Sequence, residues 1–218
     1  LTNYLGIEYE NLVQCDFICR GISSPKAQKR YVEMLEEIYN SEVVYLRSKD
    51  KRNGWNNFGS SAVFKNGQSY YADRHTDPRI IAYHKGNLIM RLACHDCKFR
   101  KLPRAADITL SDFWGIEKSE KNPNLEFGTS AVLLNSQKGK DFFLKVSDRI
   151  DTYPKKLVDV LKGNPLLFTN PKIGKNRDKF FRELDYQRFD KLVARYRHKN
   201  TIYKRIFSTL KKRMKRIM

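Results

Sequence analysis

Four cysteines are the residues of this sequence best suited to chemistry, and they form two close pairs. Three residues separate Cys15 from Cys19, and two separate Cys94 from Cys97. Two thiolates at such a spacing can bind one metal atom, as in zinc sites and iron–sulfur clusters. Close pairs in a chain of 218 residues do not match the disulfide framework of a small secreted domain. The pattern therefore indicates a metal, a cluster, or free thiols in a reducing cytosol.

The residues around Cys94 and Cys97 favour ligation over burial. His95 and Asp96 lie between the two cysteines, and Lys98, Arg100 and Lys101 follow them. Positive charge near a thiol stabilises the thiolate, which is the form that binds metals. The 74 residues between Cys19 and Cys94 make a compact zinc ribbon awkward, but they suit a cluster held between two parts of a larger domain. Buried thiols that act as small hydrophobic residues are the alternative.

Strands and helices alternate along the chain and must position these cysteines. Ser24 fits the N-cap of a helix and Pro25 its first turn, and Asn66-Gly67 is a strong hairpin signal. The side chains predicted to face inward on the helix 139–150 are Phe142, Phe143, Val146 and Ile150. The apolar run 12–19 predicts a buried strand. The other expected strands cover 42–46, 62–65, 68–71, 108–110 and 131–135, and the expected helices cover 25–40, 79–92, 139–150 and parts of 174–217.

This order of elements predicts an α/β fold of the mixed α+β type. We expect a mixed β-sheet with flanking helices and a C-terminal helical extension. The hydrophobic content of 40% is that of a folded protein, and no run of 18 apolar residues is present. Leu1 opens the sequence in place of Met, so we expect that an N-terminal part is missing.

The positive charge is concentrated at the C-terminal end. The formal net charge is +19, and residues 191–218 contain eleven Lys and Arg with no Asp or Glu. The apolar residues Ile202, Ile206, Leu210, Met214 and Ile217 recur at helical spacing. This pattern predicts a basic amphipathic helix over 201–218 that binds an anionic membrane surface. A solvated helix docked on its own domain is the alternative, and nucleic-acid binding is disfavoured because the preceding domain lacks a concentrated basic face.

Several segments resemble, in the right order, the C-terminal domain of the beta subunit of coenzyme F420 hydrogenase/dehydrogenase. Residues 16–25, DFICRGISSP, resemble the family pattern D-x-x-C-H-G-x-x-S-P. Residues 106–116, ADITLSDFWGI, resemble A-D-I-T-x-G-D-F-W-G-I. Arg47-Ser48-Lys49 with Gly54-Trp55, the segment 94–99, Gly128-Thr129-Ser130 and Arg177 with Phe180 and Phe181 extend the likeness to about residue 185. We therefore predict a domain over 1–185 and a tail over 186–218.

The resemblance implies an iron–sulfur flavoprotein. It implies a 4Fe–4S cluster and FAD that exchange electrons with coenzyme F420 or another soluble carrier. Cys19, Cys94 and Cys97 would be cluster ligands, and a further family cysteine would lie upstream of Leu1. Cys15 stands where the family has an apolar residue, so we expect a core thiol there. Three departures from the pattern are Arg20 for His, Ser48 for Asp and Ser111 for Gly, and the last puts close flavin packing in doubt.

The resemblance also implies a setting. The ferredoxin-like module of many relatives is absent here, so we expect a redox partner protein or such a module. Genes for surface-polysaccharide biosynthesis often accompany the family in bacteria, and we expect a cytoplasmic protein, peripheral at the inner face of the membrane. The alternative interpretation is a non-enzymatic protein, associated with a membrane or polyanion, that has structural zinc or free thiols.

Seven residues are candidates for the flavin site, and each has a structural alternative. Ser23 and Ser24 at a helix N-terminus could bind a pyrophosphate, although Ser24 could be only a cap. Arg47 and Lys49 could neutralise phosphate or could simply end a solvated strand. The remaining candidates are Trp55 and Trp114, which could stack on the flavin or lie in the core, and Asp112, which could bond the cofactor or cap a turn.

Overall fold

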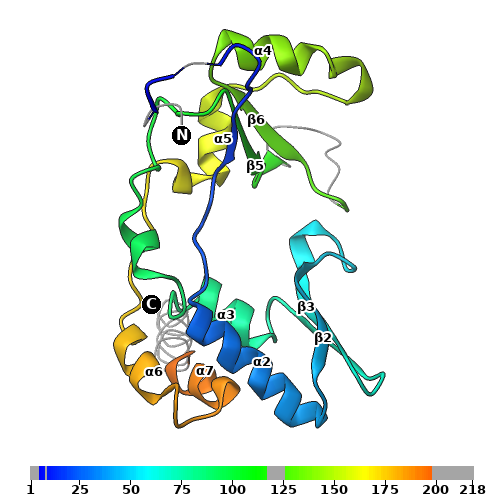
Figure 1. The fold of residues 1–218 in the computed structure, drawn as a ribbon, viewed down its shortest axis with the longest axis vertical. Helices are drawn as coiled ribbons and strands as arrows, with labels where there is room; N and C mark the ends of the chain where they lie inside the picture. Colours follow the sequence, from blue (N-terminus) through cyan, green and yellow to red (C-terminus); the bar gives the residue numbers. More distant parts are fainter. Residues whose placement is uncertain (1–4, 8, 117–125, 198–218) are drawn as a thin grey trace, which may run out of the picture. The chain divides into compact units, whose positions relative to one another are not determined.

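The described chain folds into two compact units. The computed structural model describes residues 5–7, 9–116 and 126–197. The first unit consists of Leu1–Arg20 and Asp96–Asn170, and the second consists of Gly21–His95 and Pro171–Met218. Both units contain helices and strands, which confirms the mixed α+β class (Figure 1). The boundary predicted at residue 185 stays a prediction.

The first unit contains a three-stranded mixed sheet in the order β1-β5-β6. Strand β1 runs parallel to β5, and β6 pairs antiparallel with β5. A small apolar cluster on this unit joins Phe113, Ile116 and Ala131 to Val160 of α5. The elements of the unit are β1 (Cys15–Phe17), β5 (Ile108–Asp112), β6 (Ser130–Leu134), α4 (Gln137–Leu144) and α5 (Leu157–Gly163), with single 3-10 turns at Ser147–Arg149 and Pro165–Leu167.

One face of this sheet is exposed, which corrects two predictions. Strand β1 was expected to be buried, yet Phe17 is 66% exposed. Phe17 pairs with Leu110, which pairs with Val132, and both of these are also exposed. Cys15 points to solvent as well, so it is not a core thiol. The reason is positional, because β1 is a three-residue edge strand and not a central one.

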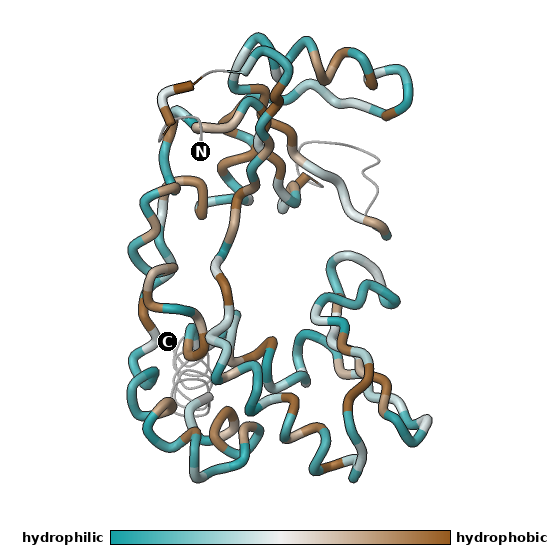
Figure 2. The backbone as a smooth tube through the Cα atoms, viewed as in Figure 1, coloured by the Kyte–Doolittle hydropathy of each residue, from teal (hydrophilic) through white to brown (hydrophobic). Residues whose placement is uncertain are grey.

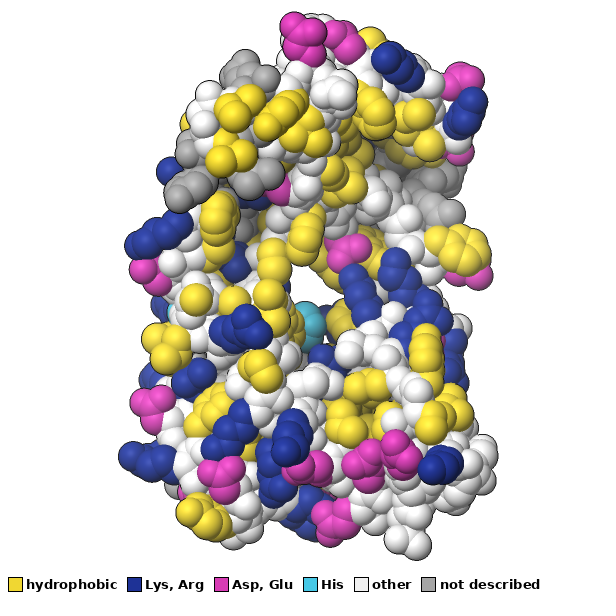
Figure 3. All heavy atoms as spheres, viewed as in Figure 1, with side chains coloured by type: hydrophobic (Ala, Val, Ile, Leu, Met, Phe, Trp, Pro, Cys, Tyr) yellow, Lys and Arg dark blue, Asp and Glu magenta, His cyan; other side chains and the backbone are white. Residues whose placement is uncertain are grey.

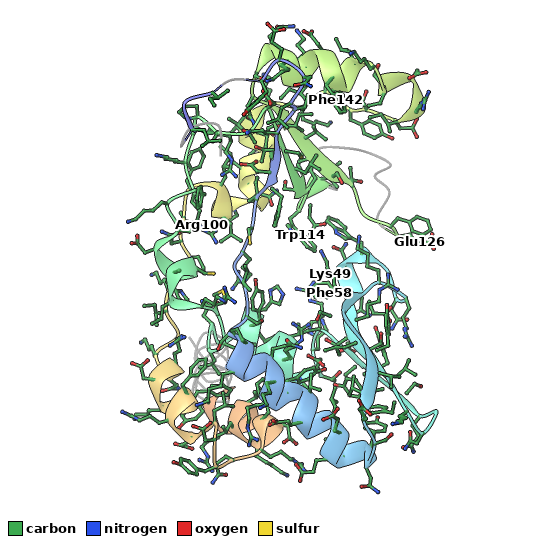
Figure 4. All side chains as sticks on the ribbon, in the orientation of Figure 1. Lys49, Phe58, Arg100, Trp114, Glu126 and Phe142 are labelled. Atoms are coloured by element: carbon green, nitrogen blue, oxygen red, sulfur yellow. The ribbon has the colours of Figure 1, made fainter. Side chains whose placement is uncertain are left out.

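Helix α4 is shorter than predicted and faces solvent. It ends at Leu144, and a 3-10 turn follows in place of a continuous helix to residue 150. Of the side chains predicted to point inward, Phe142, Val146 and Ile150 are exposed, and Phe143 is only half-buried. Figure 4 labels Phe142 beside α4, and Figure 3 shows yellow hydrophobic side chains on the surface of the same part of the molecule. Periodicity identified the helix, but not whether another element covers its apolar residues.

The second unit contains an antiparallel sheet in the order β2-β3-β4. The hairpin predicted at Asn66-Gly67 is confirmed, and Gly67 has the positive φ of 83° that the turn requires. The strands are β2 (Val43–Asp50), β3 (Gly59–Phe64) and β4 (Ser69–Asp73), and a 3-10 turn at Trp55–Asn57 precedes β3. The strands therefore form two separate sheets, because the hairpin pairs locally while β1 pairs with a strand far along the chain.

Four helices pack around the core of the second unit. Pro25 opens α2 at the predicted position, and brown apolar residues recur along this mostly teal helix (Figure 2). Tyr31, Leu35, Phe180 and Leu192 are among the buried residues that join these helices. The helices are α2 (Pro25–Tyr39), α3 (Pro78–His84), α6 (Arg177–Glu183) and α7 (Phe189–Arg197), and a 3-10 turn covers Leu92–Asp96.

One predicted helix is shorter than expected, and another is described only in part. The helix expected over 79–92 ends at His84, because Asn87 adopts a left-handed φ of 48° just after Gly86. Helix α7 is the described part of the expected C-terminal extension, and its Phe189 and Leu192 are fully buried in the core of the second unit. The amphipathic tail 201–218 lies outside the described residues. Among the helices that are described, none is both long and apolar enough to cross a bilayer.

Candidate functional site

The predicted site residues are divided between the two units. No three His, Cys, Asp or Glu side chains among the described residues are grouped so as to hold a metal ion. The proposed ligand set of Cys19, Cys94 and Cys97 therefore stays a prediction. The first unit contains Cys19, Cys97, Asp112 and Trp114, and the second contains Ser23, Ser24, Arg47, Lys49, Trp55 and Cys94.

Cys94 has the most defined surroundings of the three cysteines. It lies half-buried in the 3-10 turn after Met90, and its Sγ accepts a hydrogen bond from the backbone N–H of Ile22 at 3.2 Å. The sulfur of Cys94 thus serves as a hydrogen-bond acceptor for a backbone group. The structure thus brings the Cys94 motif together with the segment Gly21–Ser24, which holds the predicted anion-binding serines.

The segment Gly21–Ser24 is paired to the chain just before Cys94. The N–H of Ser24 donates to the carbonyl of Ile89 at 2.7 Å, and the N–H of Arg91 donates to the carbonyl of Ile22 at 2.9 Å. These bonds form an isolated antiparallel bridge between Ser23 and Met90. We call this arrangement the Ile22 clamp, defined by 21–24 paired with 89–91. It fixes where the Ile22 N–H points.

Ser24 occupies the N-cap position of α2, as predicted, but its side chain does not cap the helix. No hydrogen bond joins its hydroxyl to the first-turn N–H groups. Ser23 and Ser24 are both half-buried. The first turn of α2 therefore retains donors that a bound anion could use, since the N-terminal N–H groups of a helix attract negative charge.

His95 is a functional candidate that the sequence argument passed over. Its Nδ1 lies 2.7 Å from the carbonyl oxygen of Pro171. A carbonyl only accepts, so Nδ1 is the nitrogen that carries a proton and donates. This Nε2 is buried and has no hydrogen-bond partner among the described residues. A histidine held by one nitrogen on a backbone carbonyl, with the other nitrogen open, is typical of metal ligands. Its place between Cys94 and Cys97 was the available signal.

In the first unit, Asp16 joins three segments that are distant in sequence into one network. The Thr109 hydroxyl donates to Asp16 Oδ1 at 2.5 Å, and Arg104 Nη2 donates to Asp16 Oδ2 at 2.6 Å. Asn135 Nδ2 in turn donates to Thr109 Oγ1 at 2.9 Å. This network aligns β1 on β5, and the N–H of Ile18 extends the pairing to the carbonyl of Leu110. It therefore sets the direction in which the chain leaves β1 toward Cys19.

Asp107 holds the start of β5 in the same unit. Burial raises the pKa of its carboxyl, but the Gln14 N–H and the Ser136 hydroxyl outweigh burial and leave the pKa below its usual range. The Gln14 N–H lies 2.8 Å from Asp107 Oδ2, and Ser136 Oγ lies 2.6 Å from Oδ1. Cys97, on the loop that precedes β5, donates its N–H to the Asn170 side chain at 3.2 Å. The bond at Gln14 fixes the backbone shortly before Cys19, and the bond to Asn170 fixes the backbone of Cys97 itself.

Two cations share one aromatic ring in the second unit. Figure 4 labels Lys49 and Phe58 close to each other. Lys49 Nζ lies 5.5 Å from the centre of the Phe58 ring, and the Arg74 guanidinium carbon lies 5.1 Å from it. Arg47 is exposed on the same strand as Lys49, and no ion pair links it to a carboxylate among the described residues. Lys49, Arg74 and Arg47 thus give this unit positive side chains with which an anionic ligand could pair.

The remaining flavin candidates lie in two different settings. Trp55 is fully buried, which is the position of a core residue, and its stacking role stays a prediction. Trp114 and Asp112 are half-buried at the end of β5, and the Asn164 side chain donates to the Asp112 carbonyl at 3.0 Å. Nearby, Ser111 Oγ is buried without a hydrogen-bond partner among the described residues. A buried unbonded hydroxyl needs an explanation, and a bound polar group would supply one.

Comparison with known proteins identifies the family. No curated protein and no solved structure matches the chain. The sequence model that describes the C terminus of the beta subunit in coenzyme F420 hydrogenase/dehydrogenase matches residues 7–157. The match covers more than half of the chain and spans β1, the Ile22 clamp, the segment 94–97 and β5. This protein therefore belongs to the coenzyme F420 hydrogenase/dehydrogenase beta-subunit family, whose role is that of an oxidoreductase subunit.

Proposed function

We propose that this protein binds a 4Fe–4S cluster and FAD and passes electrons between them and a soluble carrier, either coenzyme F420 or another. Cys19, Cys94 and Cys97 are the proposed cluster ligands. Family membership supports an oxidoreductase role, and the four-cysteine sequence supplies the thiolates that iron–sulfur clusters require. A cluster exchanges single electrons and a flavin can transfer hydride, while the protein binds and orients both.

The bond between Ile22 and Cys94 is the observation that carries this proposal. The Ile22 N–H lies 3.2 Å from Sγ, so the thiol is held as a hydrogen-bond acceptor. A plain buried thiol needs no such donor, whereas sulfur ligands of iron–sulfur clusters often receive hydrogen bonds from backbone N–H groups. The chemistry of the donor set thus fits a cluster. The buried Nε2 of His95 has no partner among the described residues, and a bound group would supply one.

The flavin phosphates would be bound by residues of the second unit. Arg47, Lys49 and Arg74 would neutralise a pyrophosphate, and Ser23 and Ser24 would offer hydroxyl groups at the start of α2. The cation pair at Phe58 supports this assignment. Trp114 and Asp112 remain the candidates for contact with the ring system, Trp114 by packing and Asp112 by accepting a hydrogen bond. Trp55 would support the flavin site from the core of the second unit, beneath the phosphate-binding residues.

The test is to purify the full chain without oxygen and to measure iron, acid-labile sulfide and flavin per chain. The proposal predicts iron and sulfide together with a flavin absorption band. Cys94→Ser and Cys97→Ser should abolish the cluster, while Cys15→Ser should retain it, because Cys15 is exposed on β1. Stoichiometric zinc without a chromophore, or no metal at all, would reject the proposal and favour the non-enzymatic alternative.

We propose further that the protein is cytoplasmic, works with a redox partner protein and binds the inner membrane surface through residues 201–218. The basic composition of this tail supports the last point, since each Lys or Arg near an anionic bilayer contributes about 1 kcal/mol. A role in bacterial surface-polysaccharide biosynthesis is the proposed setting. Deleting residues 199–218 should release the chain from vesicles that contain an anionic lipid. Unchanged sedimentation with those vesicles would reject the membrane role.

A further inference from the structure

The Ile22 clamp places one backbone donor on the sulfur of Cys94, although 72 positions separate the two residues in sequence. The Ile22 side chain itself is 56% exposed, so it contributes little to packing. The important group of Ile22 is therefore its backbone N–H. The neighbouring amides at Ser24 and Arg91 are used for pairing with the opposite segment, so the Ile22 N–H is the donor directed at sulfur.

Gly21 makes this approach possible. Its φ of +149° is one that residues with a side chain rarely adopt. A Cβ at this position would lie 2.9 Å from Met90 Sδ, 3.1 Å from Cys94 Cβ and 3.3 Å from Cys94 Sγ. Any larger residue would therefore push the segment away from Cys94 or displace both side chains. Glycine is required here so that the backbone can reach the sulfur.

Side-chain anchors hold both halves of the clamp. The Tyr83 hydroxyl donates to the Gly21 carbonyl at 2.6 Å. On the other half, Arg177 donates from Nε and Nη2 to the Met90 carbonyl at 3.3 and 3.2 Å. Two helices, α3 and α6, thus fix the backbone on either side of the bond. The Ile22 N–H is held in place before any ligand binds, so its orientation costs no reorganisation during a change of charge.

We infer that the Ile22 N–H is a positioning group that raises the reduction potential of the cluster bound at Cys94. The inference rests on the proposed function and deepens it. Reduction adds one negative charge to a cluster, and part of that charge resides on the ligand sulfurs. A hydrogen bond to sulfur is stronger when the sulfur carries more charge, so it stabilises the reduced state more than the oxidised state. Hydrogen bonds to sulfur are one of the factors that set cluster potentials.

The experiment compares Ile22→Pro with Ile22→Val in the full chain, purified without oxygen. Proline removes the N–H, whereas valine retains it and changes only an exposed side chain. Iron and sulfide are measured first, and the midpoint potential follows from a titration with dithionite monitored by absorbance and electron paramagnetic resonance. We expect a more negative midpoint for Ile22→Pro and an unchanged midpoint for Ile22→Val.

Gly21→Ala is the second variant, used where Ile22→Pro does not fold or does not retain iron. It keeps every N–H group but forces the segment away from Cys94, so its midpoint should also become more negative. A variant with full iron content and the parent midpoint rejects the inference and leaves the proposed function intact. A parent chain without iron rejects both.

Discussion

Arg104 and Asp16 form an ion pair with 2.6 Å between Nη2 and Oδ2, although they lie 88 residues apart in sequence. The Arg104 side chain is only 7% exposed, and Asp16 also receives the Thr109 hydroxyl. The pair ties the loop after Cys97 to the strand before Cys19. Two of the proposed cluster ligands are thus positioned by a contact that neither cysteine makes.

Replacing Arg104 with Met should destabilise the first unit. Asp16 would lose its charged partner while part of its carboxylate stays shielded from water, so we expect a loss of about 2 kcal/mol in the free energy of unfolding. Denaturant unfolding measures this loss. Lys162→Met is the control, because Lys162 forms a surface pair with Asp159, and it should change stability by less than about 0.5 kcal/mol. Equal losses in both variants would contradict the role of the Arg104 pair.

Stability should fall at alkaline pH because of two tyrosines in the second unit. Burial, and then the charge of Asp77, raise the pKa of Tyr31 and of Tyr70 far above the usual value near 10. Both hydroxyls donate to Asp77 Oδ2, at 2.8 and 2.9 Å. Above pH 10 the unfolded tyrosines ionise while the folded ones stay protonated, so the unfolded state gains stability as pH rises. Each tyrosine should contribute about 1.4 kcal/mol per pH unit.

The pH effect is checked by denaturant unfolding at a series of alkaline pH values. Tyr31→Phe should reduce the slope of unfolding free energy against pH, and Tyr186→Phe should not, since Tyr186 is 84% exposed. Tyr31→Phe will also lower stability at neutral pH through loss of its bond to Asp77. The slope is therefore the readout, and an identical slope in parent and Tyr31→Phe would contradict the account.

Ser111→Ala should stabilise the chain without its cofactor. The Ser111 hydroxyl is buried without a partner among the described residues, so it loses its hydrogen bonds to water on folding and gains none in return. Replacing it with a methyl group removes this cost and should add about 1 kcal/mol to the free energy of unfolding. Ser60→Ala is the matched control, because the buried Ser60 Oγ accepts a bond from Arg79 at 3.2 Å. That variant should lose about 1 kcal/mol. Destabilisation by Ser111→Ala would show that its hydroxyl has a partner in solution.

Arg47→Ala should weaken flavin binding. Loss of one phosphate contact is expected to reduce affinity about tenfold, which corresponds to about 1.4 kcal/mol. Lys65→Ala is the control, since Lys65 lies on the hairpin and pairs with Glu42. Titration of the flavin-free chain with FAD, followed by flavin fluorescence, measures both. Equal affinities for parent and Arg47→Ala would remove Arg47 from the phosphate site.

The amino-acid sequence by itself determined the features that depend on a few neighbouring residues. Ser24-Pro25 marked the start of α2, and Asn66-Gly67 marked the hairpin, because backbone conformation at such positions is limited by local sterics. The ordered motifs indicated the family. The mixed α+β class also followed, since periodicity distinguishes helices from strands.

Tertiary structure decided which residues meet and which are covered. Phe142 has the spacing of an inward residue yet is exposed, because no described element covers that side of α4. The bond from Ile22 to Cys94 and the pair of Arg104 with Asp16 join segments far apart in the chain. Such contacts depend on how whole elements pack, and no local pattern encodes the distance between them. The open Nε2 of His95 belongs to the same class, because only the carbonyl of Pro171 reveals it.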